Sequence, residues 1–124
     1  MKKIEAIIRR SKLNDVKNAL TQSGLLHGMT VSEAHGLGGQ QGADGTYRGH
    51  TYARPFVPRL KLEILSTDDE ASAIVDCIFE AAYTGEVGDG KILVSAVERV
   101  YRIRTGEVME EFSVEGMAGA GRLS

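Results

Sequence analysis

The sequence predicts an α+β domain in which two β-α-β units share one four-stranded antiparallel sheet, with two helices on one face. Three observations predict this fold. Residues 2–9 and 60–65 are short segments rich in isoleucine and leucine, as strands are. Each is followed by an apolar pattern of helical period, and each helix by a further short strand segment. The order strand-helix-strand therefore occurs twice, which is typical of a ferredoxin-like double split β-α-β sandwich.

The first unit combines a strand at residues 2–9 with a capped helix and a second strand. Ser11 is expected to cap a helix over residues 12–23, and Gly24 is expected to end it. The apolar residues of this helix fall on one face: Leu13, Val16 and Leu20. A second strand is expected over residues 29–35.

The second unit begins with alternating apolar and charged residues at 60–65, the pattern of a half-buried strand. Thr67 and Glu70 have the spacing of a capping box, in which each side chain satisfies an amide at the start of a helix. The apolar residues behind them repeat at helical period: Ala71, Ile74, Val75, Ile78 and Ala82. The last strand is expected from Lys91 to about Glu98.

Composition and charge exclude several functional classes. The chain has 124 residues, the size of one domain, and its net charge of −2 gives generic nucleic-acid binding no electrostatic support. No apolar run approaches the length of a membrane span, and the first residues do not have the pattern of a signal peptide. The single cysteine, Cys77, excludes an internal disulfide and is expected to pack in the core. These features predict a cytoplasmic protein.

Residues 84–92, Thr-Gly-Glu-Val-Gly-Asp-Gly-Lys-Ile, form the clearest candidate binding segment. Its glycines allow backbone amides to approach a ligand, and successive N–H groups beside Lys91 make an anion site of the kind that holds phosphates. This is not the Walker pattern, because no Ser or Thr follows the lysine and a strand follows the loop. The alternative is a helix cap at Gly85 followed by a tight turn.

A second basic element follows the last predicted strand. If residues 99–106 are extended, Arg102 and Arg104 point to one face, where two guanidinium groups can grip a polyphosphate. The alternative is a solvated edge strand whose charges discourage edge pairing.

Residues 36–58 separate the two units and show no sustained period of either kind. Such a long loop in a small domain is uncommon and is usually either functional or disordered. It contains several glycines, both prolines and a group of contact-forming side chains: Tyr47, Arg48, His50, Tyr52, Arg54 and Phe56. We interpret it as a partner-binding arm, with a mobile loop as the alternative.

Catalytic function is not predicted. The three histidines, His27, His35 and His50, do not cluster with a nucleophile or a carboxylate in the sequence. A metal held by His35 and His50 is a further alternative, although two isolated histidines rarely make a site.

These segments together resemble the PII signal-transduction proteins, the nitrogen-regulatory family. Residues 84–92 resemble its B-loop, the pattern Tyr47-Arg48-Gly49-x-x-Tyr52 its T-loop centre, and residues 102–107 its C-loop. The segments Met-Lys-Lys-Ile at 1–4 and Gly-Met-Thr-Val at 28–31 also fit. The resemblance implies a domain at 1–107, with the T-loop at about 36–58, the B-loop at about 84–91 and the C-loop at about 101–106. The composition of the remaining tail at 108–124, acidic residues followed by glycines and alanines, predicts that it is weakly ordered.

The resemblance implies a homotrimer of ferredoxin-like subunits that binds ATP or ADP in clefts between subunits, with Mg²⁺ accompanying ATP and 2-oxoglutarate as a further ligand. The T-loop then engages a protein partner, such as a regulatory enzyme or a membrane transporter, in nitrogen metabolism. Recruitment to the membrane by a transporter would follow. The alternative is a divergent relative that senses adenine nucleotides with another effector and regulates inorganic carbon or metal transport.

The resemblance also implies roles for individual residues. It predicts nucleotide contacts for a set spread over the whole domain: Thr30, Gly38, Gly39, Gln40, Glu63, Leu65, Gly88, Asp89, Gly90, Lys91, Arg102 and Arg104. It predicts that Gln40 ligates Mg²⁺ and that Gln40, Gln41 and Arg59 contact 2-oxoglutarate. Tyr52 matches the tyrosine that is uridylylated in some members.

The sequence departs from the family pattern at several positions. Gly39 and Gln41 stand where the family usually has Arg and Lys, and Arg59 replaces a lysine. The T-loop centre lacks the usual acidic residue before Tyr52. These departures bear on the choice between ATP and ADP, on 2-oxoglutarate sensing and on uridylylation. Leu93 replaces a usual phenylalanine, which we expect to be a substitution within the core.

Overall fold

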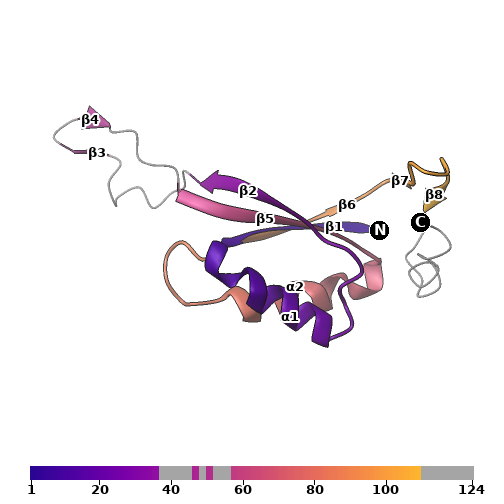
Figure 1. The fold of residues 1–124 in the computed structure, drawn as a ribbon, viewed down its shortest axis with the longest axis horizontal. Coiled ribbons are helices and arrows are strands. Elements are labelled where there is room, and N and C mark those ends of the chain that lie inside the picture. Colours follow the sequence, from indigo (N-terminus) through magenta and orange to yellow (C-terminus); the bar gives the residue numbers. More distant parts are fainter. Residues whose placement is uncertain (37–45, 48–49, 52–56, 110–124) are drawn as a thin grey trace.

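A computed structural model describes residues 1–36, 46–47, 50–51 and 57–109 of the chain (Figure 1). The main elements in order are β1 (Lys2–Arg9), the 3₁₀ helix η1 (Arg10–Lys12), α1 (Leu13–Gln22), β2 (Thr30–Gly36), β5 (Val57–Ser66), α2 (Asp68–Ala82) and β6 (Gly90–Ala96). Two short hairpins complete them: β3 (Thr46–Tyr47) with β4 (His50–Thr51), and β7 (Val100–Tyr101) with β8 (Val108–Met109).

The four long strands form one sheet in the order β2-β5-β1-β6, with every neighbouring pair antiparallel. Both helices lie on one face of this sheet (Figure 1). The predicted ferredoxin-like α+β sandwich is therefore confirmed. The central strand, β1, pairs with β5 from Lys2 opposite Ser66 to Arg9 opposite Arg59. On its other side it pairs with β6, where Ile8 lies opposite Gly90.

The hydrophobic core lies between the helices and one face of the sheet. Alternate residues of β1 and β5 point into it, because successive side chains of a strand face opposite sides. The buried strand residues are Ile4, Ala6, Ile8, Leu60, Leu62 and Ile64, and those of the helices are Val16, Leu20, Ala71, Ile74, Ile78 and Ala82. Cys77 is partly buried against this core, as expected.

We call the other side of the sheet the open face, because no described helix covers it. Its charged side chains pair across strands: Lys3 Nζ lies 3.5 Å from Glu63 Oε2, and Lys61 Nζ lies 3.6 Å from Glu5 Oε2. Leu93 belongs to this face and is 48% exposed. The expectation of a core substitution at Leu93 was therefore wrong, because the register of β6 turns this side chain away from the helices.

The start of α1 differs from the prediction, whereas its end agrees. Ser11 lies inside η1, and the N-terminal cap of α1 is Lys12, without a side-chain hydrogen bond to the helix. The Ser11 cap was therefore wrong, because one 3₁₀ turn separates Ser11 from the first α-helical residue. Gly24 adopts a φ of +71° just after the helix, as a helix-ending glycine does.

The start of α2 contains half of the predicted capping box. Thr67 Oγ1 accepts a hydrogen bond of 3.2 Å from the Glu70 amide, which confirms Thr67 as the cap. The Glu70 carboxylate instead meets His27 Nε2 at 2.9 Å, so it does not reach back to the cap. The helix ends at Ala82 and Tyr83 is extended, so Gly85 is not its cap. None of the described helices is long and apolar enough to cross a membrane.

The structure shows that the end of the predicted long loop and the start of the predicted tail belong to strands. Strand β5 starts at Val57, so Val57 and Pro58 belong to the sheet. Pro58 lies beyond the last residue pair between β5 and β1, where its missing N–H is tolerated. Strand β8 occupies the first two residues of the predicted tail. Most of the predicted partner-binding arm and residues 110–124 lie outside the described residues.

We predict that Thr67→Ala lowers the free energy of unfolding by about 1 kcal/mol, because the Glu70 amide loses its acceptor. Thr67→Ser keeps a hydroxyl and should cost much less. Chemical denaturation at one protein concentration measures both variants. An equal loss in the two would contradict a capping role for the hydroxyl.

Candidate functional site

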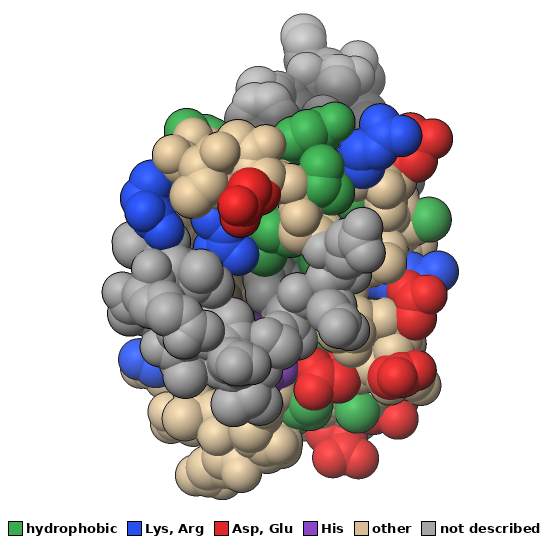
Figure 2. Space-filling model, turned by 90° about the vertical axis from the view of Figure 1, so that its right-hand side faces the viewer, with side chains coloured by type: hydrophobic (Ala, Val, Ile, Leu, Met, Phe, Trp, Pro, Cys, Tyr) green, Lys and Arg blue, Asp and Glu red, His purple; other side chains and the backbone are tan. Residues whose placement is uncertain are grey.

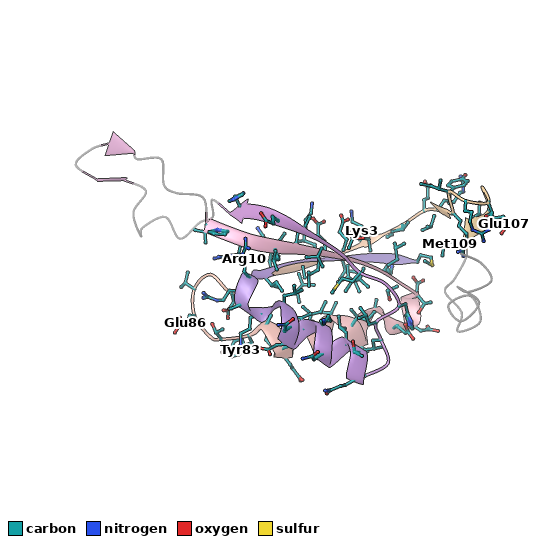
Figure 3. All side chains as sticks on the ribbon, viewed as in Figure 1. Lys3, Arg10, Tyr83, Glu86, Glu107 and Met109 are labelled. Carbon is teal, nitrogen blue, oxygen red and sulfur yellow. The ribbon has the colours of Figure 1, made fainter. Side chains whose placement is uncertain are left out.

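The glycine loop, residues 84–90, connects α2 to β6 at the end of the sheet where β1 finishes. Tyr83 and Glu86 mark it in Figure 3. Its three glycines, Gly85, Gly88 and Gly90, have φ angles of +87°, +100° and +109°. Residues other than glycine rarely adopt such angles, so the path of the backbone requires the glycines that the sequence pattern contains.

Gly90 is also required by a close approach between strands. A Cβ atom built at Gly90 would lie 1.8 Å from the Ile7 carbonyl oxygen of β1. Because that neighbour is backbone, it cannot turn aside as a flexible side chain would. Gly90 therefore fixes where the loop ends and the β1–β6 pairing begins.

The Asp89 carboxylate is turned into the loop. It accepts hydrogen bonds from the Thr84 amide at 2.8 Å, from the Gly85 amide at 2.9 Å and from the Thr84 hydroxyl. Arg9 Nε donates a further bond of 3.0 Å. The Asp89 carboxylate thus closes the loop on itself, because donors of the protein occupy both of its oxygens.

These contacts lower the pKa of Asp89 below the usual range of an aspartate, chiefly through the Thr84 hydroxyl and amide, with help from Arg9 and Gly85. A depressed folded-state pKa stabilises the fold above the ordinary aspartate value of about 3.9. That contribution is lost as the pH falls below this value toward the folded-state pKa. The loop is therefore held by an ionised carboxylate throughout the neutral range.

Arg9 binds the loop at two points. Its Nε reaches Asp89, and its Nη2 donates a 3.0 Å hydrogen bond to the Val87 carbonyl. One guanidinium group thus joins the residues on both sides of Gly88. Arg9 was missed in the sequence because it lies far along the chain from the glycine motif. The pairing of β1 with β6 would have identified it. Ile8 lies opposite Gly90, so the next residue of β1, Arg9, lies beside the preceding residue of the loop, Asp89.

Lys91 is the first residue after the loop, and its exposed side chain belongs to the open face, opposite Ile7. Three further predicted nucleotide contacts share this face: Thr30, Glu63 and Leu65. Thr30 lies opposite Glu63, and Leu65 lies opposite Lys3. Lys91 and Glu63 are two strands apart, which is about 10 Å in the direction across the sheet. The structure therefore brings these residues onto one surface with the loop at its end.

Arg59, which was predicted to contact 2-oxoglutarate, lies on the open face, opposite Ala34. Its Nη1 donates to the Pro58 carbonyl at 3.1 Å. Outside the described residues lie four predicted ligand residues, Gly38, Gly39, Gln40 and Gln41, and the predicted modification site Tyr52. Among the described residues no three His, Cys, Asp or Glu side chains gather into a metal site.

Arg102 and Arg104 lie in the turn between β7 and β8, so the extended conformation considered for them was wrong. The Arg102 amide donates to the Glu107 carbonyl at 2.8 Å, and the Gly106 amide donates to the Arg102 carbonyl at 2.7 Å. This hairpin lies at the far end of the molecule from the glycine loop, as the positions of Glu107 and Glu86 show (Figure 3). One chain therefore does not bring the two basic elements together.

The end of the molecule that carries the hairpin exposes hydrophobic side chains beside charged ones (Figure 2). Ile103, between the two arginines, is 99% exposed, and Tyr101 is more than half exposed. Large apolar side chains exposed together with arginines are typical of surfaces that contact another protein chain.

An apolar cavity of about 410 Å³ lies behind the glycine loop, between α2 and the β1–β6 pair. Phe79 and Tyr83 line it with ring centroids 5.5 Å apart. Asp89, Gly90 and Lys91 also line it. The cavity exists because the two helices do not fully cover the edge strand β6.

Residues 1–107 match the family described as "Nitrogen regulatory protein P-II". The protein of that name from Nostoc punctiforme is 54% identical over 107 residues, which cover 86% of this chain and 95% of that protein. Its namesake from Rhizobium meliloti is 53% identical with the same coverage. The "Nitrogen regulatory protein P-II 2" of Methanothermobacter thermautotrophicus is 50% identical, covering 86% and 92%. These relatives are named as regulatory proteins.

We predict that Gly90→Ala lowers the free energy of unfolding by about 2 kcal/mol or more, because a methyl group would collide with the Ile7 carbonyl at an unfavourable φ. The matched control is Gly24→Ala, which has a φ of +71° but open space around it, and should cost about 1 kcal/mol. Denaturant unfolding compares the two. Equal losses of stability would show that the close contact with the Ile7 carbonyl of β1 does not determine the cost of a side chain at Gly90.

Proposed function

The chain belongs to the nitrogen regulatory P-II family, and on this premise we propose that it binds ATP or ADP and controls partner proteins through its T-loop. The observation that carries the proposal is the glycine loop, a backbone already bent by three positive-φ glycines, with Lys91 beside it. Backbone amides in such a loop and an ammonium group favour the phosphates of a nucleotide.

The open face offers a place for the rest of the nucleotide. Thr30, Glu63 and Leu65 share that face with Lys91, and together they present polar groups and an apolar side chain. An adenine ring needs both kinds of group, since its faces are apolar and its edge forms hydrogen bonds. We assign the phosphates to the glycine loop and the base to this part of the sheet.

The separation of the basic elements supports a site completed by a second copy of the chain. Arg102 and Arg104 lie at the opposite end of the subunit from the glycine loop, on the same hairpin as the exposed Ile103. Packing that hairpin against a neighbouring subunit would bury Ile103 and supply guanidinium groups to the phosphates. We propose a homotrimer in which each nucleotide lies between two subunits.

The effect of nucleotide binding would reach the T-loop through β2 and β5. These strands carry the contacts assigned to the base; β2 ends at the T-loop and β5 begins there, where Gly36 lies opposite Val57. We propose that 2-oxoglutarate binds beside Arg59, near this point. We also propose that Gln40 ligates the Mg²⁺ ion that accompanies ATP. A ligand shifts the T-loop only if it binds the two loop conformations with different affinity.

We predict that the purified protein binds ADP and ATP in calorimetric titrations, and that Lys91→Ala weakens binding by about tenfold or more, because it removes a charged hydrogen-bond donor. Lys17→Ala, which removes the same charge from the exposed side of α1, should leave affinity unchanged. We expect Mg²⁺ together with 2-oxoglutarate to increase the affinity for ATP. Arg59→Ala should abolish this increase. The proposal fails if the wild-type protein binds neither nucleotide.

A mixing experiment tests whether two subunits share each site. Lys91→Ala and the double variant Arg102→Ala/Arg104→Ala should each bind ADP weakly. After co-assembly, a mixed trimer should regain a single intact site, formed by the loop of one subunit and the arginines of its neighbour. Calorimetric stoichiometry measures this recovery, with each variant reassembled alone as the control. No recovery in mixed trimers would rule out the shared site.

A further inference from the structure

We propose that Arg9 and Asp89 are a positioning pair, which holds the glycine loop in its anion-binding conformation without offering charge to the ligand. The inference rests on the proposed function for the identity of the ligand, whereas its geometry rests on the hydrogen bonds around the loop. Both side chains are committed to donors and acceptors of the loop itself, so they differ in role from Lys91, which projects from the open face.

The first step concerns the charge of Arg9. Its guanidinium lies 3.0 Å from the Asp89 carboxylate and 3.0 Å from the Val87 carbonyl. The side chains of Arg9 and Asp89 are only 28% and 23% exposed. A positive charge that lies beside a carboxylate attracts a distant phosphate weakly, because the two opposite charges largely cancel at that distance. Arg9 is therefore a poor phosphate ligand but a good anchor.

The second step concerns the acceptor capacity of Asp89. Oδ2 accepts from the Thr84 and Gly85 amides, and Oδ1 accepts from the Thr84 hydroxyl and from Arg9 Nε. Both oxygens are thus occupied by two donors each. The Thr84 hydroxyl in turn accepts from the Glu86 amide at 3.1 Å. The carboxylate therefore ties the start of the loop, at Thr84 and Gly85, to its end at Asp89.

The third step explains why the loop needs such a pair. Three glycines give the unbound backbone many accessible conformations, and their lack of side chains means that they cannot anchor themselves by packing. If only a small fraction of the molecules had the loop in the binding conformation, the apparent affinity would be reduced to that fraction of its intrinsic value. Arg9 reaches the loop from the end of β1, an inner strand that pairs with both β5 and β6, and so connects the loop to the sheet.

The sign of one substitution separates positioning from simple electrostatics. Asp89→Asn removes a negative charge beside a proposed phosphate site. If Asp89 acted only through its charge, this change would strengthen the binding of an anion. If Asp89 positions the loop, binding weakens, because an amide has one acceptor oxygen and its NH₂ group would face either Arg9 or the two backbone amides.

We expect Asp89→Asn to weaken ADP binding by about tenfold, the effect of reducing the binding conformation to about a tenth of the population. Glu86→Gln is the matched control, because it removes the same charge from an exposed side chain of the same loop (Figure 3). Its affinity should stay equal or rise slightly. Asp89→Asn binding ADP as tightly as, or more tightly than, the wild-type protein would overturn the proposal.

Arg9→Met should weaken ADP binding to a similar extent, and Arg9→Lys should recover part of the loss, because an ammonium can reach Asp89 but lacks the guanidinium fork. Arg10→Met is the control: it removes a neighbouring positive charge that pairs with Glu33 at 3.6 Å and not with the loop. The double variant Arg9→Met/Asp89→Asn should lose less than the sum of the single losses. Full additivity would contradict a pair that acts through one contact.

A ligand-free measurement distinguishes failure of this inference from failure of the proposed function. Hydrogen exchange of the Thr84 and Gly85 amides, followed by NMR, should accelerate by about tenfold in Arg9→Met and Asp89→Asn but not in Arg10→Met. If exchange accelerates while the wild-type protein binds no nucleotide, the pair positions the loop and the proposed ligand is wrong. Unchanged exchange would overturn the positioning role itself.

Discussion

Strand β1 pairs with β5 on one side and with β6 on the other, and both the core and the candidate site depend on this double pairing. Its alternation sends Ile4, Ala6 and Ile8 into the core. The intervening residues line the open face, where Ile7 lies opposite Lys91. A register slip of one residue between β1 and β6 would move Lys91 away from that face and separate Gly90 from its contact with β1. One hydrogen-bond ladder therefore fixes the packing and the position of the candidate ligand groups together.

The position of the site follows from the direction of the strands. Because β5 and β6 both run antiparallel to β1, their first residues lie at the end where β1 finishes. The glycine loop leads into β6 there, and the T-loop leads into β5 at Val57. Two segments that are far apart in the sequence thus share one end of the sheet. That arrangement would place the proposed ligand of the glycine loop close to the base of the T-loop.

The sequence was sufficient for the order of the four long strands and the two α-helices, for the buried positions of α2 and for the position of the glycine loop, since these are encoded by local periodicity and by residue type. It was insufficient where the outcome depended on a distant partner. Glu70 had the correct spacing for a capping box, yet its carboxylate pairs with His27 from another part of the chain. Leu93 was apolar, but only the register shows that it faces away from the helices. Arg9 was missed for the same reason, because its partners are 78 and 80 residues away.

The chemistry of the loop divides between residues that hold it and residues that remain available. Asp89 is occupied by internal donors, whereas Lys91 projects from the open face. A negatively charged residue inside a loop that is proposed to bind phosphate is electrostatically unfavourable, so its presence needs a compensating benefit. Arg9 balances that charge, and the carboxylate in return fixes amides that glycines alone would leave free to move. Under the proposed function, the loop gives up some attraction for its ligand and gains a conformation that already exists before the ligand binds.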